Sequence, residues 1–159
     1  MTATTTINWM EAMVDAAREL GASSLGFETG EVISTSDTMP DVQAGSCVAL
    51  AGDEESLQVG MAASLATCMQ LARRFCMLEP EDEDLDQADL SDVLGEIVNV
   101  LAGGMKTRIA EQAQSMSIGL PLVLYGPIEV PATTEIAVSN LRWEDQDVQL
   151  WLLHHRKGN

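Results

Sequence analysis

The chain has 159 residues, of which 46% are hydrophobic and 21% are charged, proportions typical of one folded domain. Its 25 acidic and 8 basic residues give a formal net charge of −17, which repels nucleic acids and anionic membrane surfaces. We therefore expect one domain over residues 1–159, with neither nucleic acid nor membrane as a partner. The cysteine spacing and the absence of a leader-like or long apolar segment predict a cytoplasmic protein.

The first half of the chain is predicted to contain one helix and three strands. The Thr-rich residues 1–6 are expected to be disordered, and Asn8 is placed to cap a helix that ends near Leu20. Strands are predicted at residues 26–36, 47–52 and 56–62. The last two strands flank a polar turn and should form a hairpin.

The second half of the chain is predicted to contain two helices followed by three strands. Apolar residues at helical spacing predict a helix over residues 61–78 and a second over 90–114, joined by an acidic connector at 79–89 that we interpret as a solvated loop. Strand-like runs follow at residues 120–130, 133–143 and 148–155. The order of elements indicates an α+β chain built from two similar halves, although no sequence repeat is visible.

The helix predicted over residues 90–114 has one narrow polar strip. At about 100° per residue, five positions fall within roughly 80° of one another around the helix: Asp92, Glu96, Asn99, Gly103 and Lys106. Large apolar residues occupy its other sides. A glycine on an exposed strip costs about 1 kcal/mol of helix propensity and permits close approach of another protein. The alternative is that Gly103 and Gly104 bend the helix or pack on the sheet.

Glu96 and Asn99 suit the delivery of water more than covalent catalysis. An asparagine amide both donates and accepts hydrogen bonds and can aim a water molecule, while a carboxylate can bind a lysine of a partner. Phosphoryl transfer depends mainly on positioning and on neutralisation of charge, and a glutamine that orients water suffices in GTPases. We therefore expect half a site, completed by a second protein, with no metal or cofactor of its own.

The spacing Asp-x3-Glu-x2-Asn-x21-Pro resembles the signature of the CheX/CheC/FliY family of chemotaxis phosphatases, at Asp92, Glu96, Asn99 and Pro121. The resemblance is dense over residues 90–126, where it includes Gly103, Lys106 and Leu120. Elsewhere it rests on the order of the elements. The family fold that it implies is a CheC/CheX-like α+β domain, with long helices packed on a six-stranded antiparallel sheet of pseudo-symmetric halves.

The resemblance implies a phosphatase that acts on the phosphoaspartate of a CheY-like response regulator, in chemotaxis or two-component signalling. Glu96 and Asn99 would be the catalytic residues, Glu96 pairing with a lysine of the regulator and Asn99 orienting the attacking water. Residues implied to contact the partner are Asp92, Gly103 and Lys106. Pro121 would start a strand as a structural residue, and Mg²⁺ would belong to the regulator.

Two positions differ from the family pattern. Many relatives have Asn after the motif glycine, where this chain has Gly104. In the first helix, Val14 follows Glu11 by three residues where a second motif copy would need Asn. The resemblance therefore implies one active face per chain, as in the CheX-like branch, and a homodimer.

Two other kinds of function remain open from the residues. A non-catalytic adaptor of the same fold would bind a response regulator or a flagellar switch component, although it would not need a water-orienting amide. A metal or nucleophilic enzyme is poorly supported. His154 and His155 would point to opposite faces of a strand, near the terminus, and are interpreted as part of a solvated end.

Overall fold

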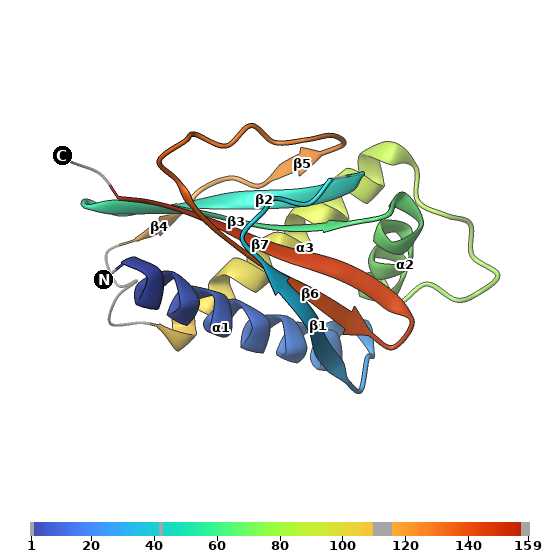
Figure 1. Cartoon of the computed structure of the whole chain (residues 1–159). Coiled ribbons are helices and arrows are strands. Elements are labelled where there is room, and N and C mark those ends of the chain that lie inside the picture. Colours follow the sequence, from blue (N-terminus) through green and yellow to red (C-terminus); the bar gives the residue numbers. More distant parts are fainter. Residues whose placement is uncertain (1, 42, 110–115, 157–159) are drawn as a thin grey trace.

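The computed structural model describes residues 2–41, 43–109 and 116–156, with α1 followed directly by a π-helical turn, η1 (Figure 1). The helical elements are α1 (Thr2–Leu20), η1 (Gly21–Leu25), α2 (Leu65–Phe75) and α3 (Gln87–Arg108). The strands are β1 (Gly30–Ser36), β2 (Ala44–Ala51), β3 (Glu55–Ala63), β4 (Ser117–Ile118), β5 (Leu122–Leu124), β6 (Glu135–Trp143) and β7 (Gln146–Arg156).

The strands form one antiparallel sheet in the order β1-β6-β7-β3-β2-β4, with β5 also paired to β2. The predicted α+β class and the hairpin of β2 and β3 are confirmed. The sixth position of the sheet is divided between two short strands, so the described sheet has seven strands instead of six. Pro121 lies between β4 and β5, and its missing N–H cannot contribute to a ladder.

The pairing pattern has the predicted pseudo-symmetry. The central strands β3 and β7 pair with each other. The first strand of each half pairs with a strand of the other half: β1 pairs with β6, and β4 and β5 pair with β2. Exchanging the two halves therefore reproduces the same strand order. In this arrangement α1 and α3 are equivalent helices that pack against each other.

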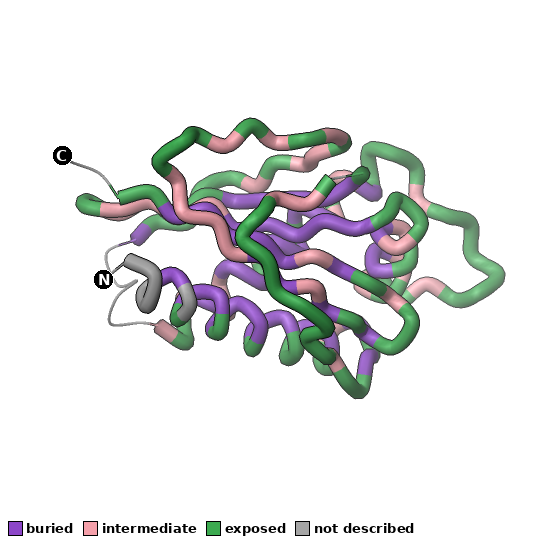
Figure 2. Tube along the Cα trace, in the orientation of Figure 1, coloured by how far each residue is buried: buried purple, intermediate pink, exposed green. Residues whose placement is uncertain are grey.

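The three α-helices cover one face of the sheet and enclose the main core, which includes Trp9, Leu71 and Leu94 (Figure 1). On the other face Trp151 lies over Gly60, its partner in the neighbouring strand. The segment after β5 crosses this second face, where Ile128 and Val130 pack against the Trp151 cluster. Figure 2 shows the buried centre of the sheet beside the exposed edge strand β1.

Some element boundaries differ from the prediction. The first helix begins at Thr2, within the stretch expected to be disordered, and Met1 lies outside the described residues. The second helix begins only at Leu65, because residues 61–63 belong to β3 and Ser64 caps the helix by accepting a hydrogen bond from the Thr67 amide. The part of the third helix predicted beyond 109 falls on residues 110–115, outside the described residues.

Residues 128–130, predicted to be a strand, are not one in the structure. Pro127 and Pro131 flank them, and neither residue has an N–H for strand pairing. The side chains of Ile128 and Val130 nevertheless pack against the apolar cluster around Trp151, on the face of the sheet away from the helices. The strand predicted at these three residues is therefore wrong.

His154 is buried, so the prediction of a solvated end is wrong for this residue. Its Nδ1 lies 2.9 Å from Thr6 Oγ1 and its Nε2 lies 2.6 Å from Glu55 Oε2. Thr6 also donates to a carboxylate oxygen of Glu135 at 2.8 Å. His155 is exposed, and the two histidines face opposite ways, as predicted. Thr6 of α1 and Glu55 of β3 therefore contact the two ring nitrogens of the buried His154.

The acidic connector is held to the protein by one arginine. Arg73 Nη1 donates to the Asp82 carbonyl oxygen at 2.8 Å, and its Nη2 donates to the Glu79 carbonyl oxygen at 2.7 Å. It also forms an ion pair with Asp84 at 3.2 Å. The connector is exposed, as predicted, but these contacts anchor it to α2. It also ends earlier than predicted, because Asp86 caps α3 and residues 87–89 are helical.

Candidate functional site: the exposed ridge of helix α3

The predicted polar strip lies on the side of α3 that faces away from the sheet. The buried side of the helix consists of residues that enter the main core: Leu90, Leu94, Ile97, Val98, Leu101, Ala102 and Met105. The five strip positions, hereafter the ridge, are exposed or half-buried: Asp92, Glu96, Asn99, Gly103 and Lys106. The helical period of 3.6 residues explains this separation.

The charged side chains of the ridge have no intramolecular partners in the described part of the chain. Asp92, Glu96 and Lys106 make no hydrogen bond or ion pair with any other described residue. A carboxylate retained for stability usually accepts hydrogen bonds or pairs with a cation. These groups are therefore available to a partner protein.

Asn99 is half-buried, and its Oδ1 atom is buried without a hydrogen-bond partner among the described residues. A buried amide oxygen that accepts no hydrogen bond costs about 1–3 kcal/mol. A polar group kept at this cost is poorly explained by folding alone. The side chain thus has unused hydrogen-bonding capacity beside the Glu96 carboxylate, one helical turn away.

The two glycines of α3 differ in their surroundings. A Cβ at Gly103 would meet no atom within 4 Å, so the ridge is open at this point. A Cβ at Gly104 would lie 3.2 Å from Ala16 Cβ, because α1 crosses α3 there. Gly104, one departure from the family pattern, is thus a helix-packing residue, while Gly103 leaves the ridge accessible.

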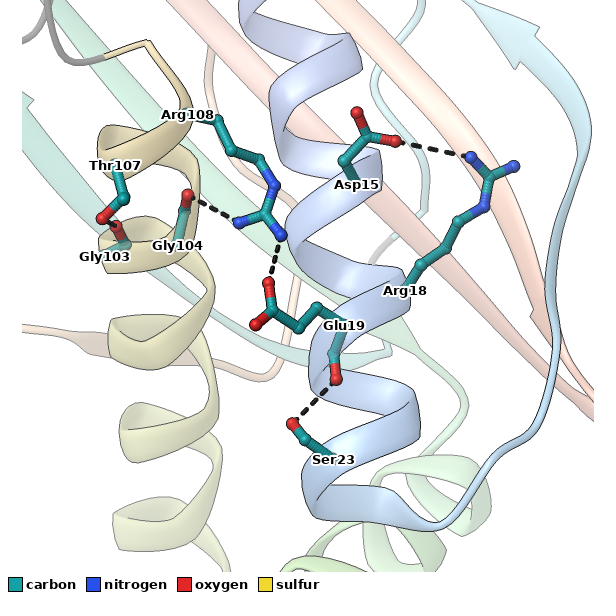
Figure 3. A network of polar contacts seen from close by, with 8 residues as sticks. All are labelled: Asp15, Arg18, Glu19, Ser23, Gly103, Gly104, Thr107 and Arg108. Atoms are coloured by element: carbon teal, nitrogen blue, oxygen red, sulfur yellow. Dashed lines mark hydrogen bonds and ion pairs between the residues drawn. The ribbon is translucent and has the colours of Figure 1, made fainter.

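The end of α3 is fastened to α1 by Arg108 (Figure 3). Its Nη1 donates to the Gly104 carbonyl oxygen at 2.9 Å, and its Nη2 contacts the Glu19 carboxylate of α1. Thr107 donates to the Gly103 carbonyl oxygen at 3.0 Å. The two bonds to carbonyl oxygens lie within the last turns of α3, and the contact between Arg108 and Glu19 joins these turns to α1.

The other side of α3 is fixed by the sheet edge. Pro121, just before β5, lies against Gly95, and a Cβ at Gly95 would be 3.3 Å from the Pro121 Cγ atom. Ser46 of β2 donates to the Leu94 carbonyl oxygen at 2.8 Å. Pro121 directly precedes β5, and its ring contacts the helix that carries Glu96.

The sequence analysis missed the contribution of Tyr125, which follows β5. Its hydroxyl lies 2.9 Å from Ser91 Oγ, one residue before Asp92, and its ring is exposed. A tyrosine in a Gly- and Pro-rich segment gives no periodic signal, so the pattern could not assign it to α3. The only clue in the sequence was its position four residues after Pro121.

The equivalent face of α1 has a glutamate but no asparagine three residues after it. Glu11 is exposed, but Val14 is buried in the main core. In the described residues, no group of three or more His, Cys, Asp or Glu side chains is arranged to hold a metal ion. A search of the same residues for a helix long and apolar enough to cross a membrane found none.

Two of three comparisons relate the chain to known proteins. The family profile described as "Chemotaxis phosphatase CheX" matches residues 44–136, more than half of the chain. A comparison with curated proteins found no match. Solved structures with the same fold include CheX from Vibrio vulnificus, at 12% identity and a TM-score of 0.77, with 92% of this chain and 99% of that chain covered.

Two further solved structures are similar to the chain. A putative chemotaxis protein from Desulfovibrio vulgaris Hildenborough has 13% identity and a TM-score of 0.77, with 92% of this chain and 96% of that chain covered. The CheX–CheY–BeF3–Mg²⁺ complex from Borrelia burgdorferi has 18% identity and a TM-score of 0.74, with 94% and 98% covered. The fold is thus CheC/CheX-like over nearly its whole length, and the profile match shows that the chain belongs to the CheX family of chemotaxis phosphatases.

Proposed function

We propose that this chain hydrolyses the aspartyl phosphate of a CheY-like response regulator. The observation that carries the proposal is the pair of Glu96 and Asn99 on an exposed ridge, without intramolecular partners among the described residues and next to the open surface at Gly103. Family membership supports phosphatase chemistry. The related CheX in the Borrelia complex is bound to CheY, BeF3 and Mg²⁺.

In this proposal Asn99 enters the active site of the regulator and positions one water molecule. The Asn99 amide accepts or donates one hydrogen bond to the water and fixes its line of approach to phosphorus. Water oxygen bonds to phosphorus, the bond between phosphorus and the aspartate oxygen breaks, and the aspartate leaves as a carboxylate. The products are inorganic phosphate and the unphosphorylated regulator.

Glu96 pairs with a lysine of the regulator and so sets the depth and orientation of docking. A carboxylate and an ammonium form a charge-assisted hydrogen bond, which is stronger when the interface excludes water. Asp92 and Lys106 contact the partner at the two ends of the ridge, and Gly103 permits close approach between them. Mg²⁺, carried by the regulator, neutralises the phosphoryl oxygens, and this chain supplies neither metal nor cofactor.

The proposal includes a cytoplasmic homodimer, as expected from the family resemblance. The exposed edge strand β1, which includes Val32 and Ile33, is compatible with self-association. Light scattering over a range of concentrations tests this part. A mass that stays at one chain at all concentrations would contradict the dimer without affecting the phosphatase proposal.

A time course of phosphate loss tests the function. Each CheY-like regulator of the same genome is phosphorylated with a small phosphodonor, and its phosphate is followed with and without this chain in the presence of Mg²⁺. We expect faster loss for at least one regulator. A non-catalytic adaptor would instead bind the phosphorylated form and slow the loss, and this result would contradict the phosphatase proposal.

A further inference from the structure

Exposed apolar side chains are concentrated beside the ridge of α3. Of the nine large apolar side chains that are exposed among the described residues, four are Val100 of α3 and, in the segment that follows, Ile118, Leu120 and Tyr125; Leu122 of the same segment points to the far face of the sheet. Leu120 is 88% exposed, so nearly all of its side chain faces solvent. Such a concentration of exposed apolar groups is typical of a protein-binding surface.

Val100 and Tyr125 lie on different flanks of the ridge, and Leu120 adjoins a residue that contacts α3. Val100 immediately follows Asn99 in the helix, one turn after Glu96. On the other flank Tyr125 meets α3 through Ser91. Leu120 precedes Pro121, whose ring lies against Gly95. We call Val100, Leu120 and Tyr125 the docking rim.

The pseudo-symmetric helix α1 itself exposes no large apolar side chain among its described side chains. Its exposed residues with described side chains are all polar or charged: Asn8, Glu11, Asp15, Arg18 and Glu19. The two helices have equivalent places in the fold, but the edge strand β1 beside α1 exposes Val32 and Ile33, and Val32 lines a hollow with Glu11 and Arg18. Val100 of α3 therefore has no counterpart on the described surface of α1, whereas the neighbouring sheet edge exposes apolar groups beside both helices.

We propose that the docking rim is the surface that binds the response regulator and sets its affinity, separately from the chemistry at Asn99. This inference rests on the proposed function. A stable protein interface covers roughly 800 Å² on each partner, which is far more than one narrow helical ridge provides. A globular partner centred on Asn99 therefore also covers Val100 and the segment around Leu120.

The charges beside the rim match the same partner. Asp92 and Glu96 are exposed carboxylates without ion pairs in the described structure, and the chain has a net charge of −17. They favour a regulator surface that presents a lysine surrounded by apolar groups. Aromatic and apolar anchors at the centre of an interface carry most of the binding energy, while charges fix orientation. A second copy of this acidic chain lacks that complementarity.

Tyr125 has two separable roles in this surface. Its ring provides apolar contact area, and its hydroxyl group is joined to Ser91, which orients the ring along α3. Tyr125→Ala removes both, whereas Tyr125→Phe keeps the ring and removes only the hydrogen bond. We expect the alanine variant to bind the regulator much more weakly than the phenylalanine variant.

Leu122 is a matched control on the same segment. It is 58% exposed, yet its register partner Cys47 belongs to the core on the far face of the sheet, away from the helices. Val123, the next residue, packs into the core beneath the helices. Because side chains alternate along a strand, Leu122 points away from the ridge, and Leu122→Ala should leave regulator binding unchanged.

The test measures binding and turnover separately. Affinity for the regulator, activated with beryllofluoride and Mg²⁺, is measured by calorimetry, and KM and kcat are measured with the phosphorylated regulator. For Leu120→Ala and Tyr125→Ala we expect the Kd and KM to rise about tenfold each, with kcat within about twofold of wild type. Unchanged affinity in both variants, or an equal loss in Leu122→Ala, would overturn the proposal.

The two proposals fail in different ways. If no regulator is dephosphorylated but Leu120→Ala and Tyr125→Ala still lose affinity for the beryllofluoride form, the phosphatase proposal is wrong and the docking rim stands. If the rim variants change the mass of this chain in light scattering and leave regulator affinity intact, a second copy occupies the rim and the docking proposal is wrong.

Discussion

Pro121 lies against Gly95, with its Cγ and Cβ atoms 3.3 and 3.4 Å from the place where a side chain at residue 95 would begin. This contact joins the sheet edge to the helix one residue before Glu96. It explains in physical terms why a proline 22 positions after Asn99 accompanies the two ridge residues in the sequence. The spacing reflects packing, not chemistry.

Gly95→Leu should separate the helix from the sheet edge. The added side chain has no space beside Pro121, and overpacking of this kind costs about 1–3 kcal/mol. Gly103→Leu is the matched control on the same helix, since no atom lies within 4 Å of its added Cβ. Denaturant unfolding measures both free energies, and equal stability of the two variants would contradict the packing role of Gly95.

The two adjacent glycines of α3 should respond differently to one substitution. Gly104→Val pushes against Ala16 of α1, whereas Gly103→Val extends into open space. Helix propensity changes equally in the two variants, so the difference reports packing alone. We expect Gly104→Val to be less stable than Gly103→Val by about 1–3 kcal/mol in denaturant unfolding. The reverse order would show that α1 and α3 are not in close contact there.

His154 should hold the start of α1 on the sheet. His154→Ala removes the contacts to Thr6 and Glu55, and loss of buried hydrogen bonds costs about 1–3 kcal/mol. The neighbouring His155→Ala provides the control, because an exposed residue changes stability by about 0.5 kcal/mol or less. Hydrogen exchange should be faster in the first turns of α1 only for His154→Ala; equal exchange in both variants would contradict this role.

The three thiols should differ in reactivity. Burial raises the pKa of the Cys68 thiol to about 11 and also raises the pKa of Cys47, whereas Cys76 is exposed. At pH 8 a thiol reagent should label Cys76 first in the native protein and all three cysteines after unfolding. Mass spectrometry of labelled peptides identifies each site. Rapid labelling of Cys68 in the native protein would contradict its burial.

The raised pKa of Cys68 also predicts a direction for alkaline stability. The folded pKa of about 11 exceeds the ordinary value of 9.0. The contribution of the neutral thiol to the free energy of unfolding is therefore fully present below about pH 9. It is lost as the pH rises from about 9 to about 11. Cys68→Ala should therefore show a smaller loss of unfolding free energy over this range than the wild type; an equal loss would contradict the assignment.

Local patterns predicted the elements that depend on local forces. The 3.6-residue period correctly separated the ridge of α3 from its buried side, and the polar turn after β2 correctly predicted a hairpin. The same reasoning was wrong where contacts between distant segments determine whether a residue is buried. His154 is buried because α1 begins early enough for Thr6 to reach it, and no pattern near residue 154 reports this.

The candidate site was predictable in part for the same reason. Glu96 and Asn99 share one helix, so periodicity alone brings them together. Tyr125 reaches α3 from a segment more than thirty positions away, through a hydrogen bond that depends on the path of β5. The sequence pattern also could not predict that Gly104 packs against α1, and the alternatives that it left open were a bend in the helix and packing on the sheet.

The most direct test of the proposed mechanism is a single-turnover measurement with this chain in excess over a phosphorylated regulator that it dephosphorylates. We predict that Asn99→Ala lowers the rate of phosphate release about 100-fold or more, while its affinity for the beryllofluoride-activated regulator stays within about threefold of wild type. Phosphate release by Asn99→Ala at the wild-type rate would contradict the assignment of Asn99 as the residue that orients the attacking water.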